Sequence, residues 1–322
     1  MSIAGHLRAI RELAADPKTL GMAGRLALRL REHRPWYAGT WFAAQITEPE
    51  ERRAFALGLL ADDGMVLTFE RDGITWTADI DSTEICLGLV TKGSYQGEEF
   101  SAVLDWVRAN RGSRSTIIDV GANIGTTSIP FAQAGYSVLA IEAVPSTFEL
   151  LCTNVSRNNL EEQVRCVPVA VSQDDTVTML LAGPSGVSES LGSGSPERTS
   201  EGRAVIERVD VPGEGLASIV DRHQLAPESI ALVWSDTQGG ETGVIRTGAD
   251  IWRSVPLYAE FWPEGLEAHG GLDDFVDEAS RWFSSFVTVA AMSTPRPVRE
   301  LHDLAGKLKT DGTNTTDVLL VP

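Results

Sequence analysis

Short apolar runs alternate with amphipathic stretches along the second half of the chain. Runs of four to eight residues rich in valine, isoleucine and leucine are typical of buried strands, and apolar residues spaced three or four apart predict helices. Three strand–helix units in a row predict a parallel sheet. A helix beginning near 146 has a capping-box pattern in Ser146 and Glu149. The expected strands cover 117–120, 136–141, 164–171, 230–234, 257–261, 286–290 and 318–321, and the expected helices include 126–134, 146–158 and 272–286.

The pattern over residues 1–112 differs from that of the second half and predicts an accessory region of helices and a β-hairpin. Two helices are expected over 4–15 and 23–32. The alternation from 65 to 78 surrounds an Asp72-Gly73 pair, which favours a tight β-hairpin turn. A helix over 98–110, with an apolar face formed by Phe100, Val103, Leu104 and Val107, leads into the main domain, which is expected to span 113–322.

Residues 183–202 are a polar, serine- and glycine-rich insertion in this domain. They offer almost nothing to bury, so the segment is expected to be mobile. Two interpretations remain open at this point: a lid that orders over a ligand, and a solvent loop without a catalytic part.

The loop after the first strand, Ile117-Ile118-Asp119-Val120-Gly121-Ala122-Asn123-Ile124-Gly125, is the most informative segment. A glycine-spaced turn between a strand and a helix is a common nucleotide-binding position. The dinucleotide pattern would need glycine at 119, 121 and 124, and only Gly121 matches. A carboxylate at 119 suits an ammonium or sulfonium better than a pyrophosphate, which favours S-adenosylmethionine.

Glu142 follows the next expected strand and is placed to accept hydrogen bonds from both hydroxyls of a ribose. Asp119 and Glu142 would then hold the two ends of one cofactor. The alternative is an ordinary strand-to-helix connection with a surface acid after it.

Three segments resemble the FkbM-type S-adenosylmethionine-dependent methyltransferases: 118–127, 141–145 and 235–241. The resemblance covers roughly residues 90 to 322. It implies a Rossmann-like class I methyltransferase fold with a doubly wound, mostly parallel, seven-stranded sheet. Family members usually have proline where this chain has Ala143, and many have glutamate where it has Gln238. With this resemblance, the residues expected to bind the cofactor are Asp119, Gly121, Ala122, Asn123, Gly125, Thr126, Glu142, Ala143 and Asp236.

Ser172 lies where the third strand exits, so its hydroxyl could reach the adenine or could simply begin a turn. Asp236, after the fourth strand, is the leading candidate for the base that takes a proton from an alcohol, or for orienting the acceptor. Capping the following helix is its structural alternative. Gln238 and Glu260 are expected to position the acceptor or cofactor. His223 and His269 are the other possible bases, both expected near exposed turns.

Asp236, Glu241 and Glu260 could together attract a divalent cation, because hard cations take oxygen ligands. Three acids without histidine are a weak signal, so no obligatory metal is predicted. Cys86, Cys152 and Cys166 have no zinc-like spacing and are expected to be small core residues.

The net charge limits the classes of partner that the protein is expected to bind. The formal charge is −18, which repels phosphate backbones and makes nucleic acid an unfavourable partner. The first 35 residues are basic instead, which suits either a solvated helical face or contact with an anionic surface. No apolar run long enough to span a bilayer and no secretory signal is visible, so a cytoplasmic location is expected.

The predicted function is an S-adenosylmethionine-dependent O-methyltransferase, with S-adenosylhomocysteine as product. The resemblance implies oxygen as the methylated atom. The expected acceptor is a hydroxyl of a sugar, glycan or polyketide-like metabolite. Two alternatives remain: a cofactor-binding scaffold without turnover, and a nicotinamide oxidoreductase.

Overall fold

The computed structural model describes residues 66–80, 83–182, 188–190 and 205–322. The helices predicted over 4–15 and 23–32, and most of the 183–202 insertion, lie outside the described residues. By its internal contacts the chain divides into two compact units. The described residues up to Tyr95 belong to the first unit, and those from Gln96 onward belong to the second.

The first unit contains the predicted hairpin. Strand β1 (Val66–Arg71) pairs in antiparallel fashion with β2 (Ile74–Asp79). Asp72 and Gly73 both have positive φ, 52° and 78°, as the tight hairpin turn requires. Helix α5 (Thr83–Lys92), which the pattern did not reveal, follows in the same unit. Cys86 on this helix is buried, whereas Cys152 and Cys166 in the second unit are half-buried, and all three thiols are free.

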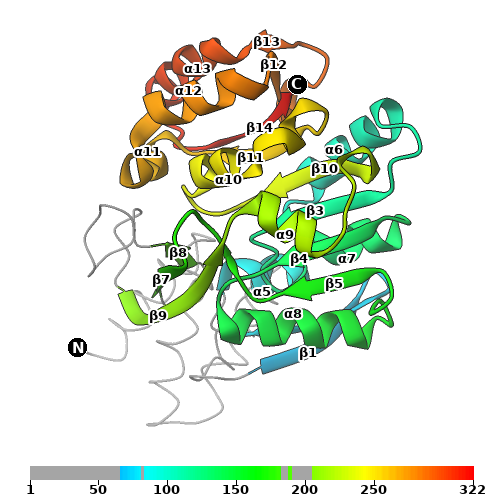
Figure 1. Ribbon diagram of the computed structural model, residues 1–322. Helices are drawn as coiled ribbons and strands as arrows, with labels where there is room; N and C mark the ends of the chain where they lie inside the picture. The colour runs from blue at the N-terminus through cyan, green and yellow to red at the C-terminus, as the bar shows by residue number, and fades with distance from the viewer. Residues whose placement is uncertain (1–65, 81–82, 183–187, 191–204) are drawn as a thin grey trace, which may run out of the picture. The chain divides into compact units, whose positions relative to one another are not determined.

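An eight-stranded, mostly parallel sheet forms the centre of the second unit (Figure 1). The five strands from β5 to β11 in the spatial order run parallel, and the strands beyond them pair in antiparallel fashion. The predicted doubly wound α/β sheet is therefore confirmed, and the two-residue β13 extends it at one edge. The spatial order is β13 (Arg296–Pro297), β12 (Ser285–Thr288), β14 (Thr316–Val321), β11 (Leu257–Phe261), β10 (Ile230–Ser235), β3 (Thr116–Val120), β4 (Ser137–Ile141) and β5 (Val164–Val167).

Helices pack on both faces of this sheet. On one face, Phe100 of α6 (Gly97–Asn110) contacts Phe131 of α7 (Ser128–Gln133), which in turn contacts Trp234 of β10. The opposite face holds a large apolar cluster, which contains alternate strand residues such as Val233 together with Ile245 and Phe275 of the helices. The helices of that face are α9 (Leu216–Arg222), α10 (Glu241–Gly248), α12 (Gly271–Trp282) and α13 (Leu301–Asp311).

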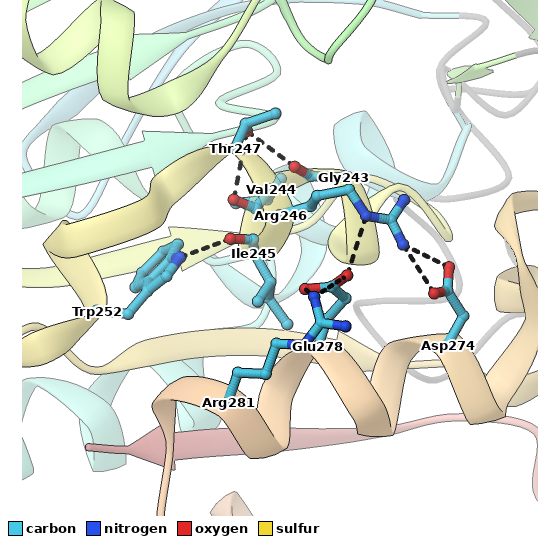
Figure 2. Close-up of polar contacts among 9 residues, drawn as sticks. All are labelled: Gly243, Val244, Ile245, Arg246, Thr247, Trp252, Asp274, Glu278 and Arg281. Carbon is cyan, nitrogen blue, oxygen red and sulfur yellow. Dashed lines mark hydrogen bonds and ion pairs between the residues drawn. The ribbon is translucent and has the colours of Figure 1, made fainter.

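Helix α10 is tied to α12 by a network of charged side chains (Figure 2). The guanidinium of Arg246 donates to both oxygens of Asp274, at 2.7 and 2.8 Å, and to Glu278 at 3.2 Å. Glu278 also accepts from Arg281, and the Trp252 indole donates to the Ile245 carbonyl at 2.7 Å. This network fixes the helix that begins directly after residues 236–240.

A second sheet is inserted between β5 and α9. It has the order β6 (Ala170–Val171), β9 (Val205–Glu214), β7 (Thr176–Ala182) and β8 (Ser188–Ser190). The prediction of one strand over 164–171 was wrong, because β5 ends at Val167 and Pro168, which has no N–H to donate, interrupts the ladder. Met179 and Val211 of the inserted sheet pack against Val144.

Two helix boundaries also differ from the prediction. Helix α8 (Pro145–Arg157) begins at a proline with Val144 as its N-cap and without a side-chain cap, so the Ser146–Glu149 capping box does not form. Helix α12 ends at Trp282, because Phe283 is extended and leads into β12. The remaining short elements are α11 (Pro263–Leu266) and 3-10 turns at 227–229, 249–253, 267–269, 289–291 and 298–300.

Candidate functional site

The glycine loop after β3 is in contact with the end of β10. The Gly121 and Ala122 amides donate to the Ile141 carbonyl, and Gly121 has a φ of 81°. A Cβ at Gly121 would lie 2.1 Å from the Asp236 carbonyl oxygen. The close contact between the two loops therefore requires glycine at this position. Gly125, with a φ of 96°, would meet Ile129 and Leu151 side chains at 3.1 Å. Both glycines therefore fix how the loop packs.

Asp119 is a fully buried carboxylate at the end of β3. One oxygen, Oδ2, accepts the Ser128 hydroxyl at 2.5 Å, and the other, Oδ1, has no hydrogen-bond partner among the described residues. Burial raises the pKa of Asp119 to about 6, and the nearby hydroxyls of Ser128 and Thr127 oppose this rise. An unpaired buried carboxylate oxygen fits a ligand that brings a positive charge or a hydrogen-bond donor.

Glu142 lies at the end of β4, also buried. Its two oxygens accept the backbone N–H groups of Asn123, at 2.9 Å, and Val144, at 2.8 Å. Burial raises the pKa of Glu142 to about 7, although these N–H groups favour the ionised form. Each carboxylate oxygen has a second lone pair, so both can still accept a hydroxyl.

Asp236 is held by two glutamine side chains. Gln96 donates to Oδ2 at 3.0 Å, and Gln238 donates to Oδ1 at 2.9 Å. The Gln238 amide also donates to Glu260 at 2.9 Å, so the three predicted catalytic residues do come together. Burial raises the pKa of Asp236, and the two amides oppose that rise. Gln96 was missed, because it lies 140 residues from Asp236 and no local pattern marks it.

Glu241 has a structural place under this loop. It is fully buried, and its Oε1 accepts both the N–H and the hydroxyl of Thr237, at 2.9 and 2.8 Å. Burial raises the pKa of Glu241 to about 7. Helix α10 has Gly240 as its N-cap without a side-chain cap, so the alternative role of Asp236 as a helix cap is wrong. Within the described residues, no group of three or more histidine, cysteine or acidic side chains has metal-binding geometry.

The other predicted residues have local roles in the structure. The Ser172 hydroxyl accepts the Asp174 N–H at 3.1 Å, as a turn-initiating serine does, and the Asn123 side chain accepts the Ile124 N–H. Ala122 is buried, Thr126 is half-buried, and Ala143 packs against the inserted sheet.

The two histidines differ from expectation. His223 and His269 are half-buried rather than exposed, and burial lowers the pKa of each. His223 contacts Arg165, and His269 contacts Ser190. In the part of the chain that is described, neither histidine is hydrogen-bonded to Asp236.

Residues 119–281, half of the chain, match the family model of the methyltransferase FkbM domain. The match includes the glycine loop, Glu142 and the Asp236–Glu260 group. The chain therefore belongs to the FkbM methyltransferase family, and its cofactor is S-adenosylmethionine. Its sheet is the class I methyltransferase type of Rossmann-like fold.

Solved structures that match this chain include TYW2 of Pyrococcus horikoshii in complex with MeSAdo, at 14% identity and a TM-score of 0.38, covering 81% of this chain and 72% of that one. TYW2 of Methanocaldococcus jannaschii in complex with AdoMet has 11% identity and a TM-score of 0.36, with 80% and 85% covered. A tRNA methyltransferase of M. jannaschii has 12% identity and a TM-score of 0.39, with 80% and 56% covered. The comparison with curated proteins found no match. None of the described helices is both long and apolar enough to cross a membrane.

The contact at Gly121 gives a prediction for stability. Gly121→Ala is expected to lower the free energy of unfolding by at least about 2 kcal/mol more than Gly135→Ala does. Gly135 also has a positive φ, but a Cβ added there would meet no atom of the described residues within 4 Å. The control should lose only about 1 kcal/mol from backbone strain. Urea unfolding of both variants measures the difference, and equal losses would mean that the Gly121 contact is not tight.

Asp119 gives a prediction for pH dependence. Its folded-state pKa of about 6 exceeds the ordinary 3.8, so the buried charge costs stability increasingly as the pH rises from about 4 through 6. Without ligand, Asp119→Asn should therefore raise the melting temperature at pH 8 and change it little at pH 4. The gain in the free energy of unfolding at pH 8 should be at most about 3 kcal/mol. A melting temperature that is lowered equally at both pH values would show that the charge is not the cause.

Proposed function

We propose that this methyltransferase is an O-methyltransferase that methylates a hydroxyl of a sugar, a glycan or a polyketide-like metabolite, with Asp236 as general base. The observation that carries the proposal is the position of Asp236: a carboxylate held by two amides, whose own backbone touches the glycine loop. A base within reach of the methyl donor suits deprotonation of an alcohol.

The donor side of the site fits S-adenosylmethionine. The unpartnered Oδ1 of Asp119 suits the positive charge of the donor, and Glu142 suits its ribose hydroxyls. The loop residues Gly121, Ala122, Asn123, Gly125 and Thr126 would surround it, with Ala143 and Ser172 toward the adenine. When bound, this cofactor supplies an electrophilic methyl group on a cationic sulfur.

On the acceptor side, Asp236 would accept the proton of the acceptor hydroxyl, so that the oxygen could take the methyl group that the bound donor would supply, with S-adenosylhomocysteine as the product left behind. The protonated Asp236 then returns the proton to solvent. Gln238 and Glu260 orient the acceptor, because the Gln238 amide joins the Asp236 and Glu260 carboxylates. Holding the acceptor hydroxyl beside the base and facing the methyl group would supply much of the rate enhancement.

The net charge supports this acceptor class over nucleic acid. The formal charge of −18 disfavours a polyanionic acceptor such as RNA, and a neutral or cationic hydroxyl compound meets no such repulsion. We further propose that residues 113–322 form the cofactor-binding domain and that residues 1–112 are accessory to it.

Asp236→Asn is expected to bind S-adenosylhomocysteine with near wild-type affinity in calorimetry and to lose at least ~100-fold in turnover, because only the base is removed. Turnover is measured as transfer of labelled methyl from S-adenosylmethionine to a panel of sugars, oligosaccharides and macrolactone alcohols. Asp277→Asn, at an exposed position of α12, is the matched control and should leave both quantities unchanged.

Three results would contradict the proposal. Heat from S-adenosylhomocysteine without transfer to any alcohol would favour a cofactor-binding scaffold. Transfer to RNA in place of the alcohols would overturn the acceptor class. Full activity of Asp236→Asn would remove Asp236 as the base.

Turnover is also expected to survive a chelator. Gln238 places an amide NH₂ between the Asp236 and Glu260 carboxylates, where a cation would otherwise lie. Activity measured after treatment with EDTA should equal that of the untreated protein, and added magnesium should not raise it. Loss with EDTA and recovery with magnesium would show that a metal assists.

A further inference from the structure

The two glutamines that hold Asp236 share an unusual backbone conformation. Gln96 has a φ of 56° and Gln238 a φ of 52°, both in the left-handed region that favours glycine. Each is followed directly by a glycine, Gly97 and Gly239. Glycine at 96 or 238 would adopt the same backbone conformation without strain. Side chains at such positions carry strain, which is commonly retained where the side chain has a function.

Asp236 also lies among other acidic side chains. Asp119 of β3, Glu241 of α10 and Asp317 of β14 all interact electrostatically with it. Glu260 is linked to it through Gln238. Of the residues that the structure describes, no lysine, arginine or histidine is paired with Asp236, and its hydrogen bonds come from the two glutamine amides.

The side chain of Gln96 has no other role in its own helix. Gln96 is the N-cap of α6, but its side chain makes no capping hydrogen bond there. It reaches instead to Oδ2 of Asp236, while Gln238 occupies Oδ1. The two donors lie far apart in the sequence of the second unit, and together they fix both oxygens of one carboxylate.

We propose that Gln96 is a positioning residue for Asp236. Its amide fixes Oδ2, so that the carboxylate keeps one orientation and stays ionised among the other acidic side chains. The strained backbone at Gln96 is retained for this contact. The inference rests on the proposed function, because orienting Asp236 affects turnover only if Asp236 acts on the acceptor.

The test compares three variants of the full chain: Gln96→Gly, Gln96→Met and Gln224→Gly. Glycine relieves the backbone strain and removes the amide, and methionine keeps the length of the side chain without the donor. Gln224 is the matched control, because it has the same φ of 56° and is exposed after α9. The carboxyl signal of Asp236 is titrated by NMR on protein labelled with ¹³C at aspartate, and it is assigned by its loss in Asp236→Asn.

The pKa of Asp236 is expected to rise by roughly one unit in both Gln96 variants, because a donor to the charged form is lost. It should not change in Gln224→Gly. The melting temperature of Gln96→Gly should equal or exceed that of the wild type, as for Gln224→Gly. On any acceptor found with the panel, kcat/KM of the Gln96 variants should fall at least ~10-fold, with its acidic limb moved to higher pH.

An unchanged Asp236 titration in both Gln96 variants, or an equal shift in the Gln224 control, would overturn the inference. If Gln96→Gly is less stable than the wild type, Gln96→Met decides by the same titration. If no alcohol of the panel is methylated, the proposed function is wrong, but the titration of Asp236 still tests the role of Gln96. The two failures are therefore distinguishable.

Discussion

The contact between Gly121 and the Asp236 backbone is the constraint on which the rest of the site depends. Strands β3 and β10 are neighbours in the sheet, and the Asp236 N–H donates to the Val120 carbonyl, so the chain after each strand leaves at the same edge. With no side chain at position 121, the two loops touch, and the acid that follows β10 lies beside the loop that follows β3. The Arg246 network then holds α10, and with it the 236–240 turn, against α12.

The second common property of the site is that its carboxylates are desolvated and have no cationic partner within the described part of the chain. Asp119, Glu142, Asp236 and Glu241 are stabilised by hydroxyl, amide and backbone N–H groups, and burial raises the pKa of each. Neutral donors offset only part of the cost of burying a carboxylate. The remainder is available to a ligand with a positive charge, which lowers the free energy of these carboxylates when it binds. A cationic methyl donor meets this electrostatic requirement.

The sequence predicted what depends on short-range pattern. The parallel strands, the Asp72-Gly73 hairpin, and the positions of Asp119, Glu142 and Asp236 at strand ends follow from periodicity and from the geometry of parallel sheets. It did not predict the Gln96 contact, because a hydrogen bond between residues 140 positions apart leaves no local signal. The inserted sheet was missed for a related reason: Pro168 ends β5 inside an apolar run that otherwise reads as one strand.

Ala143 illustrates how a departure from the family pattern has a physical consequence. Its N–H is one of three backbone groups that favour the ionised form of Glu142, together with those of Asn123 and Val144. A proline at 143 has no N–H and would leave two such donors. The small side chain of Ala143 also lies in the apolar cluster with Val144 and the inserted sheet. Compared with the proline of the resembled pattern, alanine at 143 therefore adds a third backbone donor to the buried Glu142 carboxylate, and the inserted sheet packs against the same residue.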